Sequence, residues 1–306
     1  MRKFKLTANV AKRLMNLDFS GKTADNASVQ EPLAAESIPD EKAEKQNPEE
    51  RIPAGSLRMA WRTDIGKIRK TNQDAVILGD CIAGIADGMG GHRGGETASA
   101  GLRDGILREI VGMEPTEERL RTAVQKVNGE LWDQQEHDAT LSGMGTTLTL
   151  LWAAPDRMII AQVGDSRAYL YRDGTLRQIT SDHSMVADMV RKGVLTEEQA
   201  ACHPMRNYIT RAVGTDDTLD VDIVDMPRHA GDRWLICSDG LHGAVPRAEL
   251  ARMVAIENLE ESANALLEEA LKNDGRDNIS LILVLDERDD SQSREPVHAL
   301  RKEGRD

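Results

Sequence analysis

Four aspartates in this sequence stand at the ends of short apolar stretches, where side chains from different strands can meet. Asp87 lies in IADGMGGH, Asp165 in IIAQVGDSRAY and Asp239 in WLICSDGLHG, while Asp277 of GRDNISLILVL stands just before such a stretch. Each aspartate alone favours an ordinary turn. Together they favour a cation site, because clustered carboxylates need positive charge to stay ionised. No cluster of histidine or cysteine indicates zinc, and an all-oxygen site selects Mg²⁺ or Mn²⁺.

The elements that must position these aspartates are short strands and two pairs of helices. Segments that are β-branched or alternating predict strands over residues 57–66, 74–78, 81–87, 146–154, 157–165, 167–174, 221–226, 233–239 and 279–285. Adjacent strands such as those within 157–179 are joined by turns too short for a crossover helix, so the sheets must be largely antiparallel. Helical spacing predicts helices outside packed sheets, an α+β architecture, over residues 95–111, 116–137, 247–255 and 259–273.

Composition narrows the class of protein. A chain of 306 residues with 40% hydrophobic residues can bury one large core, and we expect one domain with appendages. The net charge of −13 argues against nucleic acid as a partner, because phosphate backbones are held by clustered Lys and Arg. Three cysteines without CxxC spacing exclude a zinc ribbon and fit the reduced thiols of a cytoplasmic protein. The sequence has no apolar run of about 18 residues, the length that a membrane span needs.

The two ends of the chain differ in composition from the part between them. Residues 1–56 comprise a basic stretch with interspersed apolar residues, over 1–19, and an acidic linker whose composition is typical of disorder. Two interpretations of the basic stretch stay open: an amphipathic helix that lies peripherally on an anionic membrane or docks on a partner, and a frayed tail. Residues 287–306 form a charged C-terminal tail, which leaves 57–286 as the folded domain.

Seven motifs, in a fixed order, carry a family resemblance. They are RKTNQDAV, IADGMGGHRGGETAS, GMGTTLTLL, VGDSRAYLYRDG, QITSDHSMVADMVRKGVLTEEQAACHPMRNYITRAVGT, LICSDGL and GRDNISLILV. This set resembles the PPM family of metal-dependent serine/threonine protein phosphatases, the protein phosphatase 2C type, and its bacterial branch most closely. The resemblance covers residues 57–285. It implies an α-β-β-α sandwich, in which two packed antiparallel β-sheets are flanked by helices.

The resemblance also implies roles for individual residues. Asp87 would bridge two metal ions, Mn²⁺ or Mg²⁺, and the carbonyl of Gly88 would contact one of them, helped by the missing Cβ. Asp239 and Asp277 would hold the other ion. Two such ions lower the pKa of a bridging water, so that hydroxide attacks phosphorus directly and no phosphoenzyme forms. Arg69 matches the arginine that the family places on the substrate phosphate, where a planar fork of donors suits two oxygens.

Four further residues have less definite roles. Asp74 would orient metal-bound water, and Asp165 is expected to support the fold rather than bind metal. His92 would either protonate the departing serine or threonine oxygen or serve as a structural loop histidine. The family has an aspartate for a third ion shortly before GMGTT. In this sequence Asp138 stands five residues before Gly143, so that carboxylate is either shifted or absent.

Residues 181–215 match the family's flap, a segment that lies beside the active site and varies with substrate. Four basic residues of this segment are candidates to meet a phosphopeptide, and at least half of them are expected to be ordinary solvated charges: Arg191, Lys192, Arg206 and Arg211. Hereafter the flap means residues 181–215.

The expected function is that of a cytoplasmic, Mn²⁺- or Mg²⁺-dependent phosphatase, monomeric by default. It would act on phosphoserine and phosphothreonine in proteins and oppose a serine/threonine kinase, an expectation that rests on family analogy. Two alternatives keep the fold: an anti-sigma-antagonist-type phosphatase, and a non-catalytic PPM-like binding module. The presence of Asp87, Asp239 and Asp277 counts against the binding module. A two-metal nuclease fits poorly, because the chain is acidic and lacks a basic groove.

Overall fold

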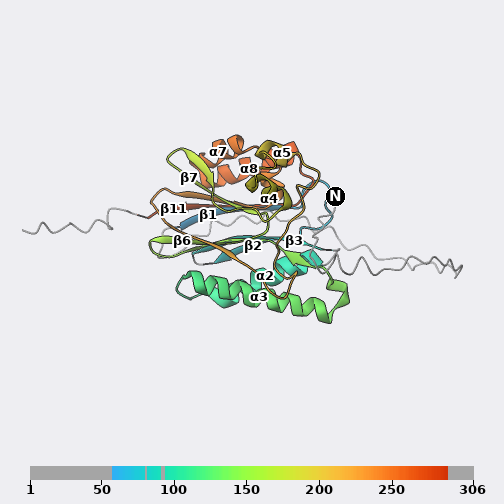
Figure 1. Cartoon of the computed structure of the whole chain (residues 1–306). Coiled ribbons are helices and arrows are strands. Elements are labelled where there is room, and N and C mark those ends of the chain that lie inside the picture. The colour runs from blue at the N-terminus through green and yellow to red at the C-terminus, as the bar shows by residue number, and fades with distance from the viewer. Residues whose placement is uncertain (1–56, 80, 91–93, 289–306) are drawn as a thin grey trace, which may run out of the picture. The chain divides into compact units, whose positions relative to one another are not determined.

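The computed structural model describes residues 57–79, 81–90 and 94–288. The predicted N-terminal arm and linker, His92 and the C-terminal tail from residue 289 lie outside these described residues. Within them the chain forms four layers, with helices outside two sheets that lie face to face (Figure 1). This arrangement confirms the predicted α-β-β-α sandwich.

The first sheet has six strands, all paired antiparallel. Its strand order is β2-β3-β5-β6-β9, with the short β4 paired to β3. The bounds are β2 Asp74–Gly79, β3 Ile82–Met89, β4 Gly145–Thr146, β5 Leu148–Ala153, β6 Arg157–Val163 and β9 Asp222–Pro227. Strand β3 is buried along its whole length, because a helix covers one face and the second sheet covers the other.

The second sheet has five strands, also antiparallel, in the order β1-β11-β10-β7-β8. The bounds are β1 Leu57–Asp64, β7 Arg167–Arg172, β8 Thr175–Gln178, β10 Arg233–Cys237 and β11 Ile279–Asp286. The core between the sheets contains buried residues of both, among them Ile85 and Leu151 from the first and Trp234 and Ile282 from the second. This packing fixes the two sheets against each other, so that strand ends of both meet at a common edge.

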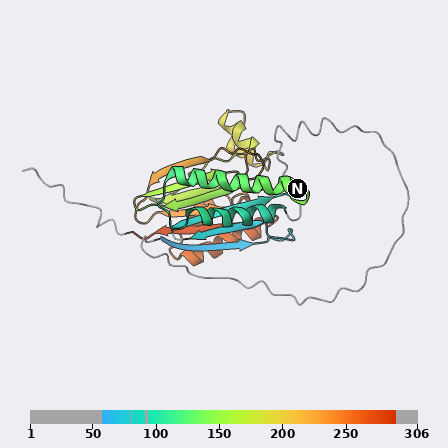
Figure 2. The same cartoon turned by 90° about the horizontal axis from the view of Figure 1, so that it is seen from below.

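Helices cover the outer face of each sheet. Helices α2 (Gly94–Ile110) and α3 (Glu117–His137) lie side by side on the first sheet (Figure 2). Helices α6 (Asp239–His242), α7 (Arg247–Val254) and α8 (Leu259–Asn273) lie against the second. Helix α3 begins where the Thr116 hydroxyl accepts from Arg119 N, and α8 where Asn258 accepts from two backbone amides, as N-caps do.

The remaining short helices are η1 (Ala139–Leu141), and α4 (Met185–Arg191) and α5 (Glu197–Ala201) of the flap. The flap returns to the first sheet through a bridge between Thr146 and Val213. In the described part of the chain, no helix combines the length and apolar character that crossing a membrane requires.

Candidate active site

Two of the predicted site aspartates face each other at one end of the first sheet. Asp74 is the first residue of β2 and pairs in register with Asp87 of β3. Residues directly opposite on paired strands place their side chains on the same face, so the two carboxylates are neighbours. Asp87 is buried, and its backbone is fixed on the other side by Thr147, whose Oγ1 accepts from Asp87 N at 3.0 Å. The register therefore brings these carboxylates together.

Gly88 lies where three backbone segments meet. Its N–H donates to the carbonyl oxygen of Gln73 at 3.0 Å. A Cβ at position 88 would lie 2.1 Å from the carbonyl oxygen of Gly95 and 2.5 Å from that of Gln73. Only glycine allows the start of α2 to approach β3 this closely. The glycine-rich sequence after Asp87 is therefore required by packing, whatever else it does.

The other two predicted ligands lie on adjoining segments of the second sheet. Asp239 opens α6 just after the end of β10, with Ser238 between them, and Asp277 precedes β11, the strand paired with β10. A Cβ at Gly240 would lie 2.0 Å from the carbonyl oxygen of Asn278, so the two segments are in close contact. Ser238 reinforces this contact, because its N–H donates to the Ser280 carbonyl at 3.0 Å.

Side-chain hydrogen bonds join the ends of the two sheets. The Ser238 hydroxyl, beside Asp239, donates to Asp74 Oδ2 at 2.9 Å. Asn278, beside Asp277, accepts from Gln73 N at 2.9 Å through Oδ1. The predicted carboxylates of the first sheet and those of the second therefore belong to one acidic edge, defined here as Asp74, Asp87, Asp239 and Asp277.

Arg69 lies at this acidic edge. Its Nη2 is 2.8 Å from Asp277 Oδ2, and its side chain is about one-third exposed. Burial lowers the pKa of Arg69, but Asp277, and with it Asp87 and Asp239, raises it more, so the net shift is upward. All three carboxylates that the sequence suggested as metal ligands therefore act electrostatically on the guanidinium. They come from both sheets.

The loop that carries Arg69 packs closely against the segment that precedes β11. Gly66 has φ +78°, and a Cβ there would lie 2.3 Å from the Asp277 carbonyl oxygen. The Asn278 side chain donates from Nδ2 to the carbonyl oxygens of Ile65 at 2.9 Å and Thr71 at 3.0 Å. Asn278 and Ser238 were not among the predicted site residues. Their positions next to two site aspartates, in GRDN and CSDG, were the available signal.

The donor set of the acidic edge fits a hard divalent cation. It consists of carboxylate oxygens and backbone carbonyls, with no nitrogen or sulfur ligand, as Mg²⁺ and Mn²⁺ prefer. Among the described residues, however, no three His, Cys, Asp or Glu side chains are gathered as a closed metal-binding cluster. Asp277 instead pairs with Arg69. The arginine places a positive charge beside the carboxylates.

Two other predicted residues lie outside this constellation or at its margin. Asp138 is the N-cap of η1 and accepts from Thr140 N at 2.8 Å and Thr140 Oγ1 at 2.7 Å. These hydrogen bonds lower the pKa of Asp138, and the residue is exposed. Asp165 is buried in the turn after β6, where its carbonyl oxygen lies 2.9 Å from His242 Nε2. The Asp138 carboxylate is thus engaged within η1, and this contact of Asp165 is made by its backbone.

The flap adjoins the acidic edge through apolar contacts. Met89, which directly follows Gly88, packs with Ile209 and Ala212 of the flap. Two of the four basic residues named above are engaged within the chain, because Arg191 pairs with Asp188 and Arg211 with Asp222. Lys192 and Arg206 are exposed.

Comparison with known proteins gives consistent matches. A family model described as protein phosphatase 2C matches residues 68–276. The serine/threonine protein phosphatase PstP of Mycobacterium tuberculosis is 39% identical over 231 residues, which cover 74% of this chain but only 45% of PstP. The serine/threonine phosphatase stp of Listeria monocytogenes is 38% identical over 248 residues, covering 77% of this chain and 98% of that protein.

A solved structure extends the match to three dimensions. The crystal structure of the catalytic domain of PstP in complex with two manganese ions has a TM-score of 0.71 and 36% identity, covering 76% of this chain and 99% of that chain. The fold of this chain is therefore that of the bacterial serine/threonine phosphatases it matches. The chain belongs to the protein phosphatase 2C family.

Proposed function

We propose that this chain removes phosphate from phosphoserine and phosphothreonine in proteins, using two Mn²⁺ or Mg²⁺ ions held at the acidic edge. Asp87, Asp239, Asp277 and the carbonyl of Gly88 would hold the ions. The observation that carries the proposal is the position of Arg69, whose guanidinium contacts Asp277 and whose pKa is raised by Asp277, Asp87 and Asp239, carboxylates from two different sheets. An arginine in such a place offers paired donors to a phosphate that arrives beside the carboxylates.

Arg69 and Asp74 would have separate roles in the reaction. Arg69 would exchange its contact with Asp277 for the substrate phosphate, because its planar fork can grip two phosphate oxygens. Ser238 holds the Asp74 carboxylate in one orientation, which suits Asp74 to orient water. When bound, the ions supply a water of lowered pKa as nucleophile and neutralise the charge of the phosphoryl oxygens. His92 stays a candidate general acid.

Several finer points belong to the proposal. The two-manganese complex of PstP supports two ions here, and we leave out a third because Asp138 is engaged in capping η1. The substrates would include the phosphorylated form of a serine/threonine kinase, and the enzyme would act as a monomer. Cytoplasmic location, and contact of the N-terminal arm with a membrane surface or partner, rest on sequence composition alone.

The test is hydrolysis of a phosphothreonine peptide with Mn²⁺, with Mg²⁺ and with chelator, for the wild type and Asp239→Asn. Asp217→Asn, an exposed change elsewhere on the domain, is the matched control. We expect metal-dependent activity in the wild type and control, and its collapse in Asp239→Asn. A folded wild type without activity under either metal would refute the proposal and favour the binding module.

A further inference from the structure

The flap is tied to the body of the domain by a buried histidine at its beginning. His183 is 5% exposed. Its backbone also pairs with the body and with the far end of the flap, since His183 N donates to the Gly164 carbonyl and Thr210 N donates to the His183 carbonyl, both at 2.8 Å. The proposed mechanism assigns no role to this histidine, although it belongs to the SDHS sequence that opens the flap.

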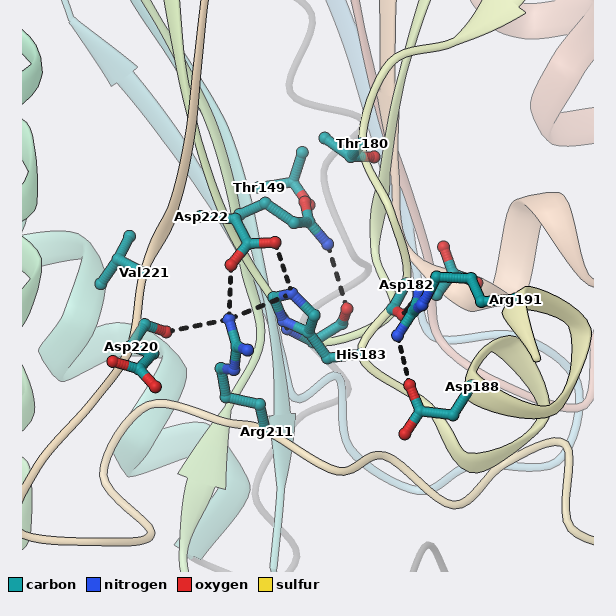
Figure 3. A network of polar contacts seen from close by, with 12 residues as sticks. Thr149, Thr180, Asp182, His183, Asp188, Arg191, Arg211, Asp220, Val221 and Asp222 are labelled. Carbon is teal, nitrogen blue, oxygen red and sulfur yellow. Dashed lines mark hydrogen bonds and ion pairs between the residues drawn. The ribbon is translucent and has the colours of Figure 1, made fainter.

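The contacts of the imidazole fix its tautomer. Gly164 N lies 3.1 Å from Nδ1, and a backbone amide can only donate, so Nδ1 is unprotonated. Nε2 therefore carries the proton of the neutral ring and donates to Asp222 Oδ2 at 3.1 Å, while Arg211 Nη1, which is also a donor, lies 3.2 Å from the same nitrogen (Figure 3). Asp222 is the first residue of β9, at the edge of the first sheet. The neutral ring thus connects the turn after β6 to β9.

Arg211 reaches the same carboxylate from the other end of the flap. Its Nη1 lies 2.6 Å from Asp222 Oδ1 and 3.2 Å from the carbonyl oxygen of Asp220 (Figure 3). Two flap residues that are far apart in sequence, His183 and Arg211, therefore share one aspartate of the sheet. The Asp222 carboxylate therefore holds the beginning and the end of the flap together.

Gly164, the residue hydrogen-bonded to Nδ1 of the imidazole, is connected to the acidic edge by further hydrogen bonds. Gln162 Nε2 donates to the carbonyl oxygens of Gly164 at 3.0 Å and Ser166 at 2.8 Å. The Ser166 hydroxyl lies 2.8 Å from Thr147 Oγ1, which accepts from Asp87 N. A continuous set of polar contacts thus runs from the base of the flap to the backbone of Asp87.

We propose that His183 is a positioning residue: its neutral imidazole clamps the flap between Gly164 and Asp222 and so sets the surface that a phosphopeptide meets beside the acidic edge. The inference rests on the proposed function. The packing of Met89 against Ile209 and Ala212 makes the flap surface a neighbour of the site, so a displaced flap changes peptide binding before it changes the carboxylates.

The clamp is sensitive to protonation of His183. A proton on Nδ1 would point at the Gly164 N–H and remove that hydrogen bond. The charged groups that face the ring are Asp222 from β9 and Arg211 and Arg191 from the flap. Burial lowers the pKa of His183, and the two arginines add to this effect while Asp222 opposes it. The clamp is therefore closed near neutral pH and opens as the pH falls.

Paired variants separate the two contacts of the ring. His183→Asn keeps an oxygen near the Nδ1 position that can accept from Gly164, but it cannot reach Asp222. His183→Gln places an amide near the Nε2 position and can still donate to Asp222. Asp222→Ala removes the shared carboxylate, and Asp217→Asn, at an exposed position outside the clamp, is the control.

The experiment measures KM for a phosphothreonine peptide and kcat/KM for the small substrate para-nitrophenyl phosphate, both with Mn²⁺. We expect His183→Asn and Asp222→Ala to raise the peptide KM about threefold to tenfold, the size of one net hydrogen bond. The value of kcat/KM for para-nitrophenyl phosphate should change little in all variants. The double variant His183→Asn/Asp222→Ala should raise the peptide KM no more than the more impaired single variant does. His183→Gln should raise the peptide KM less than His183→Asn does. The peptide KM of the wild type should rise at acid pH, because protonation of His183 removes its hydrogen bond with Gly164 N. The peptide KM of His183→Asn should not rise in this way, because this variant has no imidazole to protonate.

Hydrogen–deuterium exchange gives a readout that is independent of activity. Exchange should become faster in the flap of His183→Asn, while α8 stays as in the wild type. Parallel loss on both substrates, or an unchanged peptide KM and flap exchange, would overturn the role of His183. A wild type inactive on both substrates would instead refute the proposed function, and exchange would still decide whether the histidine holds the flap.

Discussion

Replacing Gly88 with alanine tests whether the close packing at the acidic edge is essential. The new Cβ would lie 2.1 Å from the Gly95 carbonyl oxygen and 2.5 Å from that of Gln73. Carbon and oxygen atoms that are not bonded approach to about 3.3 Å, so the backbone must open by about 1 Å on both sides. Neither oxygen belongs to a flexible side chain that could turn away.

The expected cost follows from this geometry. Overpacking a tight site usually costs about 1–3 kcal/mol, and two backbone clashes place Gly88→Ala at or above the upper end, about 3 kcal/mol. The shift also displaces the Gly88 carbonyl, so metal-dependent activity should be lost. Urea unfolding measures the first effect, and hydrolysis of a phosphothreonine peptide with Mn²⁺ measures the second.

The control is the same substitution at Gly129. This glycine lies within α3, and a Cβ there would meet nothing within 4 Å. Gly129→Ala should therefore stabilise the protein by about 0.5–1 kcal/mol, because alanine loses less backbone entropy in a helix. Wild-type stability and activity in Gly88→Ala would refute the packing argument.

Three further predictions concern single side chains. Arg69→Lys should lower kcat/KM for a phosphopeptide about tenfold to a hundredfold, because a lysine cannot bind two phosphate oxygens in one plane, and an unchanged value would remove Arg69 from the site. Asp138→Ala should lower the urea midpoint through loss of the η1 cap, yet leave the dependence of activity on Mn²⁺ unaltered. A changed Mn²⁺ dependence would restore Asp138 as a ligand. Asp286→Ala should cost about 3–5 kcal/mol in urea unfolding, because it leaves the buried guanidinium of Arg228, 2.8 Å away, without this partner. A cost below about 1 kcal/mol would contradict that interpretation.

Much of the fold could be predicted from the sequence because its signals are local. Helix α3 follows its predicted range closely, since Thr116 supplies an N-cap directly before it. The strand predicted over 57–66 ends at Asp64, because the chain turns at Gly66 with φ +78°. The four-residue β8 was not predicted as a separate strand, and its pairing with β7 defines it.

The site could be predicted only in part. Strand ends followed by Asp-Gly identified Asp87 and Asp239, and the register of β2 and β3 brings Asp74 beside Asp87. The hydrogen bond from Ser238 to Asp74 joins two different sheets across 164 positions of sequence. The contact of His183 with Asp222 likewise depends on how the flap folds back. Such pairings follow from tertiary packing, which no local pattern encodes.

The most direct measurement is calorimetric titration of Mn²⁺ into the wild type, Asp239→Asn and the control Asp217→Asn. We expect two ions per chain for the wild type and the control, and weaker or incomplete binding for Asp239→Asn, because this variant removes one of the charges that would hold the ions. No Mn²⁺ binding by the wild type, or identical binding by Asp239→Asn, would contradict the claim that the acidic edge is a two-metal site.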